Sequence, residues 1–298
     1  MYQAALFSAC MFAQSIEAKL DHVVIAVHDL KAAERVYSGL GFTITPGGRH
    51  PGGTQNSAAV FSGGSGYLEL LTPYDVSLPD GSEVAQLLEH GEGAFELGLA
   101  IDSAEQAARD LSAAGLKIKG PTPGTIVRPG EKEPPPPRWW IISFADKDPS
   151  RPVFLVQYIP DPARPRTPRP PHPNTASSHS AVLVAVNDPE KAAAGYGKIG
   201  KLSPTEIELP EFGAIAKEIV LATGSIFLMR ATDPSGPTAQ HLKTQGEGIL
   251  GVRLAVTDLD ETRRAIRKKN VSKDEQSVLV PPENADGVWL QLGLWGRQ

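Results

Sequence analysis

DHVVIAVHDLKAAERVYSGLGF, residues 21–42, reads as an apolar strand, an acidic turn, a short amphipathic helix and a glycine stop. Asp29 stands just before the helix, where a short oxygen side chain can cap free N–H groups. His22 is out of place in the strand, because a valine would pack there at lower cost. The stretch therefore indicates a strand–helix unit and marks His22 as a candidate functional residue.

The strand–turn–helix pattern recurs three more times, so the chain is an internal repeat. The further copies are FELGLAIDSAEQAARDLSAAGLKI (95–118), AVLVAVNDPEKAAAGYGKIGKL (181–202) and GVRLAVTDLDETRRAIRKKNV (251–271). Strand-like runs follow every helix, as AAVFSG and GYLELL do after the first one. Each unit is therefore about β-α-β-β-β, and since such a unit cannot bury both faces of its sheet alone, copies should pair.

The sequence thus predicts an α+β fold of four βαβββ units, paired into two domains with curved mixed sheets around a cleft. We expect an N-terminal domain over residues 1–160, a Pro-rich linker over 161–178 and a C-terminal domain over 179–298. A second proline run, residues 131–138, interrupts a unit and is predicted to form a surface loop.

Composition favours a small-molecule partner. The 298 residues carry a net charge of -5, and the sequence pI is near 5.8, so neither nucleic acid nor an anionic membrane surface is an expected partner. The one cysteine, Cys10, forms no intrachain disulfide and fits a cytoplasmic protein. It lies in an apolar run, residues 4–13, that lacks the basic residues of a signal peptide, so an N-terminal strand or helix is favoured.

Three motifs in order resemble one known family. LDHVVIAVHDL, GFTITPGGRHPGGTQN and GYLELL are similar to the glyoxalase-like branch of the vicinal oxygen chelate superfamily, which includes glyoxalase I, extradiol dioxygenases and bleomycin-resistance proteins. The resemblance is specific over roughly the first 75 residues, is looser through RWWIISF and VFLVQYI, and beyond residue 178 depends on the repeat architecture. It implies vicinal-oxygen-chelate-type domains around a metal cleft, in agreement with the repeat argument.

A metal site follows from strand alternation and the resemblance together. His22 shares a strand face with Val24, and the strand GYLELL can bring Glu69 to that face. Overlaying the second unit on the first places Glu96 at the position of His22, and Gln157 near that of Glu69. These four side chains are all divalent-metal ligands, and two carboxylates neutralise a dication.

We therefore expect one divalent ion, Zn, Ni, Co, Mn or Fe, on His22, Glu69, Glu96 and Gln157, with the ligand order swapped in the second unit relative to the family. The alternative is a structural histidine and an exposed edge glutamate. In the later units the same overlay places Ala181, Leu228, Gly251 and Gln291, so the C-terminal domain is predicted to have lost the ligands and to serve as support or cover.

Substrate contacts are predicted from two further stretches. In the glycine-rich loop, Arg49 is a candidate for binding a carboxylate or carbonyl, His50 for acid–base catalysis, and Thr54 and Asn56 for orienting hydrogen bonds. A solvated hairpin loop is the alternative. On the strand after the proline run, Arg138 and Trp140 are candidate substrate contacts, although alternation sends Trp139 and Trp140 to opposite faces and makes one of them core.

The predicted chemistry is Lewis-acid catalysis. Mononuclear iron oxygenases usually need two histidines and one carboxylate, so oxygen activation is disfavoured. We favour a metal-dependent lyase or isomerase that acts on a small oxygenated substrate through a stabilised enolate or enediolate; by resemblance to glyoxalase I, Glu69 or Glu96 is the base. The alternatives are a non-catalytic sequestering protein of bleomycin-resistance type and, less favoured, a non-haem iron dioxygenase. No nucleotide cofactor is expected, and a homodimer is left open.

Overall fold

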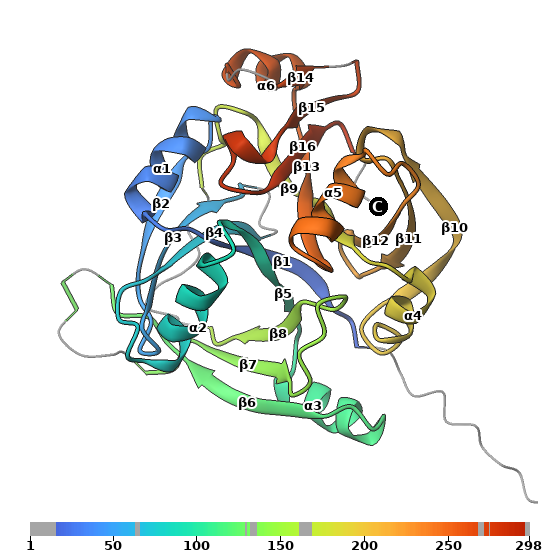
Figure 1. Ribbon diagram of the computed structural model, residues 1–298. Helices are drawn as coiled ribbons and strands as arrows, with labels where there is room; N and C mark the ends of the chain where they lie inside the picture. The colour runs from blue at the N-terminus through green and yellow to red at the C-terminus, as the bar shows by residue number, and fades with distance from the viewer. Residues whose placement is uncertain are drawn as a thin grey trace, which may run out of the picture.

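The chain forms two eight-stranded curled sheets that lie side by side (Figure 1). The computed structural model describes residues 16–62, 66–128, 130–131, 136–160, 169–267, 271–273 and 275–295. Sheet A consists of β1 Lys19–Ala26, β2 Ile44–Arg49, β3 Thr54–Val60, β4 Tyr67–Pro73, β5 Gly93–Ala100, β6 Ile118–Gly124, β7 Trp139–Phe144 and β8 Val153–Tyr158. Sheet B consists of β9 Ala176–Ala185, β10 Lys201–Leu209, β11 Ala214–Val220, β12 Ser225–Ala231, β13 Gly248–Val256, β14 Ser272–Lys273, β15 Ser277–Val280 and β16 Trp289–Gly293.

The two sheets share one strand order, which confirms the predicted α+β fold of four paired units. Sheet A runs β2-β3-β4-β1-β5-β8-β7-β6, and sheet B runs β10-β11-β12-β9-β13-β16-β15-β14. In sheet A, β1 pairs with β4 in parallel and with β5 antiparallel; β9 makes the same two kinds of pairing in sheet B. The mixed, curled sheets therefore repeat the same unit four times.

Four helices follow the first strand of each unit, as predicted, and begin at capping oxygens. They are α1 Leu30–Gly39, α3 Ala104–Ala113, α4 Pro189–Ala194 and α6 Leu259–Ala265. Their caps, Asp29, Ser103, Asp188 and Asp258, each accept hydrogen bonds from N–H groups of the first turn.

Two helices, α2 Pro79–Leu88 and α5 Pro237–Thr244, were not predicted, although each begins with proline at its first position. α2 lies within the curl of sheet A (Figure 1). Its Val84 and Leu88 pack against Val24, Ala26 and Leu71. α5 lies within the curl of sheet B, where its Leu242 packs against the buried cluster of that face. These helices cover part of the concave face of each sheet.

The main apolar core runs through both halves of the chain. It includes Leu68 and Leu70 of β4 as well as Val182 and Val184 of β9, all fully buried. Backbone contacts also join the halves, since Leu20 N–H donates to the carbonyl of Thr223 at 3.2 Å. The two sheets therefore do not fold around separate cores.

The two ends of sheet A meet. Arg49 and Val127 exchange backbone hydrogen bonds of 2.9 and 2.8 Å, which connects the edge strand β2 to the segment between β6 and β7. Sheet A is thus a nearly closed half-barrel with a distinct concave face. We call it the N-terminal half-barrel, and sheet B the C-terminal half-barrel.

Some predictions fall outside the described residues: Cys10 and the apolar run 4–13, and residues 132–135 and 161–168 of the two proline runs. Among the described helices, none is both long and apolar enough to cross a membrane.

Candidate functional site

His22 lies on the concave face of the N-terminal half-barrel, and both of its ring nitrogens face carboxylates. Its Nδ1 is 2.6 Å from Asp21 Oδ2, and its Nε2 is 3.5 Å from Glu69 Oε2. The ring lies flat against Tyr67, with centroids 4.5 Å apart and planes 6° apart. Only 4% of His22 and 6% of Glu69 are exposed, so strand alternation has brought the predicted pair together in a buried place.

The backbone of β5 makes room for this imidazole. Gly98 pairs with His22 across the sheet, and a Cβ on Gly98 would collide with the histidine ring. Any side chain at position 98 would displace the imidazole, so glycine is needed for the His22 ring to lie close to the backbone of β5.

Glu69 is held by an amide whose own orientation is fixed. Asn56 Nδ2 donates to Glu69 Oε1, and Asn56 Oδ1 accepts from the backbone N–H of Gly48 at 3.0 Å. Because Gly48 engages the oxygen, the NH₂ group of Asn56 must face the carboxylate. Glu69 Oε1 is therefore occupied, and Oε2 is the atom that faces His22.

Asp21 and His22 form a buried charge pair. Burial would raise the pKa of Asp21, but the bond to His22, its charge and the hydroxyl of Tyr158, which donates at 2.6 Å, hold this pKa below its usual value. Burial would lower the pKa of His22, but the bond and charge of Asp21, followed by the charge of Glu69, raise it. In the absence of another cation, His22 is the positive charge that balances two buried carboxylates.

Glu96 lies on the same concave face, since it pairs with Val24 on β1 as Glu69 does from the other side. Burial, with a smaller contribution from the charge of Glu83, raises the pKa of Glu96 to about 7. Within the described residues, no hydrogen bond stabilises its charged form. A carboxyl group with this pKa exchanges protons readily near neutral pH.

The residues present can fill two coordination positions of one divalent ion. Two ligands about 2.1 Å from one ion at a near-tetrahedral angle lie about 3.4 Å apart, close to the separation of His22 Nε2 and Glu69 Oε2. The carboxylate on the far nitrogen of His22 is the partner that metal-bound histidines usually have. In the part of the chain that the structure describes, however, no three His, Cys, Asp or Glu side chains gather as a metal site, so Glu96 has not converged on the pair.

The fourth predicted ligand, Gln157, is wrong. Its Oε1 accepts from the backbone N–H of Ala104 at 2.8 Å, on the convex side where α3 lies. The register places Phe154 where Gln157 was expected, because Phe154 pairs with Gly98 as Glu69 pairs with Val24. A slip of residue parity along β8 caused the error, and an aromatic ring stands at the fourth ligand position, 5.3 Å from the His22 ring.

The side chains of the glycine-rich segment that joins β2 to β3 lie on both sides of sheet A. His50 Nδ1 is 3.0 Å from Thr54 Oγ1, and Thr54 and Asn56 follow the concave face of β3 toward Glu69. Arg49 is exposed, and its guanidinium lies 4.7 Å from the ring centroid of Tyr74. Of the four residues predicted in this loop, Asn56 contacts Glu69 directly, His50 and Thr54 contact each other on the same face, and Arg49 lies away from it.

On strand β7, Trp139 rather than the predicted Trp140 lies on the concave face. Trp139 pairs with Tyr158, its indole lies over Gly124, and its ring meets that of His50 at 6.3 Å. Trp140 packs against the main core, so its predicted substrate role is wrong, and Trp139 takes the concave position. Arg138 is half-buried and forms an ion pair with Glu131 at 3.1 Å, which does not involve the concave face residues.

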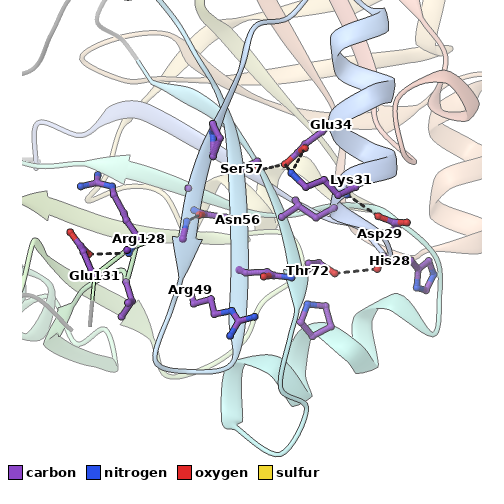
Figure 2. Close-up of a pocket in the computed structure, with 18 residues that line it drawn as sticks. His28, Asp29, Lys31, Glu34, Arg49, Asn56, Ser57, Thr72, Arg128 and Glu131 are labelled. Atoms are coloured by element: carbon purple, nitrogen blue, oxygen red, sulfur yellow. Dashed lines mark hydrogen bonds and ion pairs between the residues drawn. The ribbon is translucent and has the colours of Figure 1, made fainter. Parts of the chain in front are cut away.

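A separate hollow of about 780 Å³ lies on the α1 side of the same strands (Figure 2). It is lined by Glu34 and Lys31 of α1 and by Arg49 and Asn56, and Ser57 Oγ donates to Glu34 at 2.7 Å across it. His22 and Glu69 do not line it. Asn56 is the residue that it shares with the concave site.

The C-terminal half-barrel has lost the pair, as predicted. Ala181 stands at the position of His22, and Phe227, rather than the predicted Leu228, stands at that of Glu69. Arg253 pairs with Ala181, lies in the position of Gly98, and bonds to Gln291 at 2.6 Å and to Glu211 at 3.2 Å.

Tyr158, Asp21 and His179 were missed by sequence reasoning. Asp21 precedes His22 and lies at a register shift in β1, which no sequence pattern reveals. His179 is buried with both ring nitrogens unpartnered among the described residues, and burial lowers its pKa to about 3. A histidine in the apolar strand that opens the third unit was a signal of the same kind as His22.

Comparison with known proteins identifies the family. The model of the glyoxalase-like domain matches residues 20–200, more than half of the chain, so this protein belongs to the glyoxalase-like domain family. A hypothetical protein from Staphylococcus aureus has a crystal structure similar over 92% of this chain and 98% of its own, at 12% identity and a TM-score of 0.62.

A mutant of 4-hydroxymandelate synthase from Streptomyces coelicolor is similar over 94% of both chains, at 17% identity and a TM-score of 0.55. These two likenesses establish a shared two-sheet fold. Methylmalonyl-CoA epimerase from Mycobacterium tuberculosis matches 40% of this chain and 88% of its own at 24% identity, with a TM-score of 0.35. No curated protein matches the chain.

Proposed function

We propose that the concave face of the N-terminal half-barrel is the active site of a metal-dependent isomerase or lyase for a small oxygenated substrate. The observation that carries the proposal is the pair His22 Nε2 and Glu69 Oε2, 3.5 Å apart, with the far nitrogen of His22 supported by Asp21. A divalent ion bound by this pair would supply Lewis acidity toward a substrate carbonyl.

The chain's own residues divide the remaining work. Glu96, with a pKa of about 7 and no hydrogen bond to its charged form, takes a proton from the carbon beside the carbonyl; the electron pair of the broken C–H bond moves into that carbonyl. Returning the proton to a neighbouring atom completes an isomerisation. His50, held by Thr54, is the second proton carrier on this face.

Metal analysis of the full chain tests this function. After exposure to Zn, Ni, Co, Mn or Fe and dialysis, wild-type protein should hold about one ion per chain, and His22→Ala and Glu69→Gln should each lose it, because each removes one of two protein ligands. His90→Ala and Glu89→Gln are matched controls, since both residues are exposed in the turn after α2. Glu96→Gln should keep the ion but lose turnover.

A second function is favoured by one observation. Phe154 fills the fourth ligand position with a hydrocarbon ring, as expected for a protein that binds a small molecule without a metal. Wild-type protein that binds ligand while holding no ion, unaffected by His22→Ala, would support this sequestering function and contradict the enzymatic one.

A further inference from the structure

Aromatic side chains surround the concave site. The ring of Tyr67 lies against His22, that of Phe154 meets it edge-on, and that of Trp139 meets His50. Five aromatic residues of the described strands on or beside this face are partly exposed: Tyr67, Phe95, Trp139, Phe154 and Tyr158. Phe95 and Phe154 also pack against the cluster that includes Val84 and Leu88 of α2, so a ligand can contact only the part of each ring that stays exposed.

Apart from His22, whose pKa is raised, the charged groups identified on the same face are acids. Asp21, Glu69 and Glu96 belong to it, and within the described residues none of them forms an ion pair with a lysine or arginine. Lys147 does act electrostatically on Glu96, but its ammonium is exposed and is paired with Glu83 of α2. The field at the site is therefore negative or, with a dication on His22 and Glu69, near neutral.

Two arginines near the site, Arg49 and Arg138, contact other residues. Arg49 is exposed beside Tyr74, and Arg138 is paired with Glu131. The C-terminal half-barrel shows that the fold accepts a cation on this face, since Arg253 stands where the N-terminal one has Gly98. The absence of an arginine opposite His22 is thus a property of this half-barrel and not of the fold.

We infer that the site takes an uncharged ligand that carries an aromatic ring next to its oxygen atoms, and that it excludes carboxylates and phosphates. Among the described residues, a negative ligand finds no lysine or arginine on this face, and the imidazolium of His22 is already paired with Asp21. Such a ligand also meets Glu69 and Glu96, whereas the aromatic rings can stack on a flat apolar group. The inference deepens the proposed function and rests on it for the role of the ligand's oxygen atoms.

Three probes that differ in one property each test this inference. They are 2-hydroxyacetophenone, 4-(hydroxyacetyl)benzoate, which adds a negative charge at the far side of the ring, and hydroxymethyl cyclohexyl ketone, which replaces the aromatic ring. Binding to metal-loaded full-length protein is measured by calorimetry. We expect 2-hydroxyacetophenone to bind at least about tenfold more tightly than either of the others.

Equal or tighter binding of the charged or the cyclohexyl probe overturns the inference. Phe154→Leu should reduce the preference for the aromatic probe over the cyclohexyl one, with the metal content unchanged. Failure of the proposed function is a separate result: a protein without metal that still prefers 2-hydroxyacetophenone contradicts the enzyme but not the ligand class, and a metal-loaded protein that prefers the charged probe does the reverse.

Discussion

The two half-barrels differ in which strand of an equivalent cross-strand pair carries the large polar side chain. In the N-terminal one, His22 of β1 lies over Gly98 of β5, whereas in the C-terminal one, Arg253 of β13 lies over Ala181 of β9. The first arrangement gathers carboxylates around an imidazole, and the second pairs a guanidinium with Glu211 and Gln291. The same fold thus holds a candidate reactive centre in its N-terminal half and, in its C-terminal half, an arginine that is already bonded to Glu211 and Gln291.

Breaking the ion pair of the C-terminal half-barrel should have the largest effect on stability. Glu211→Ala leaves Arg253 half-buried beside Phe227 and Trp295 without its carboxylate. We expect a loss of about 3 kcal/mol in the free energy of unfolding, measured with urea, and an unchanged metal content. Glu105→Ala, from an exposed pair with Arg109, should cost under about 0.5 kcal/mol. Loss of metal in Glu211→Ala would show that the two halves are not separate in role.

Filling the space opposite His22 should damage the N-terminal site. Gly98→Ala places a methyl group where the imidazole lies, so the ring must move away from Glu69. Metal affinity should fall by about a hundredfold, or about 2.7 kcal/mol, by competitive chelator titration. Gly93→Ala on the same strand meets nothing closer than 3.8 Å and is the control. Equal affinity in both variants would contradict the role of the His22 ring.

The pH dependence of stability should report the half-buried Glu96. Its folded pKa of about 7 exceeds that of the unfolded chain, so the folded state holds a proton that the unfolded state releases, and stability falls as pH rises from about 4.5 through 7. At pH 8, metal-free Glu96→Gln should be about 2 kcal/mol more stable than wild type, and near pH 4 the two should agree. Parallel curves across this range would show that Glu96 is not desolvated.

The smallest effect is expected at His179, which stands where the N-terminal unit has Leu20. His179→Leu removes two buried ring nitrogens without partners among the described residues, and should raise stability by about 1 kcal/mol at neutral pH. Since the folded pKa of about 3 lies below the unfolded one, wild type loses stability as pH falls below about 6.5, and the variant should lose less. A destabilised variant with altered metal affinity would instead indicate that His179 supports Asp21.

Sequence alone predicted the repeat, the fold and the central pair, for identifiable reasons. Capping residues and apolar alternation located the four unit helices, and the face shared by His22 and Glu69 follows from alternation within β1 and β4. Positions that depend on register were not predictable in the same way. Gln157 is next to Tyr158, and Trp140 is next to Trp139, and in each pair the second residue lies on the concave face. A shift of one residue exchanges the two faces of a strand.

Contacts between distant segments were also beyond the sequence. Tyr158 reaches Asp21 from 137 positions away, and the amide of Asn56 is oriented by the backbone of a neighbouring strand. Such contacts arise from sheet closure, which local patterns do not encode. The helices α2 and α5, by contrast, carry local signals, a proline start and spaced apolar residues, so both were predictable from the sequence.

X-ray absorption spectroscopy of the cobalt-loaded full-length protein is the most direct test of a shared ion between His22 and Glu69. A shared ion predicts one imidazole in the cobalt coordination shell of wild type, with a Co–N distance near 2.1 Å, and no bound cobalt in His22→Ala. A shell of oxygen atoms alone in wild type, or an imidazole that persists in His22→Ala, would contradict it.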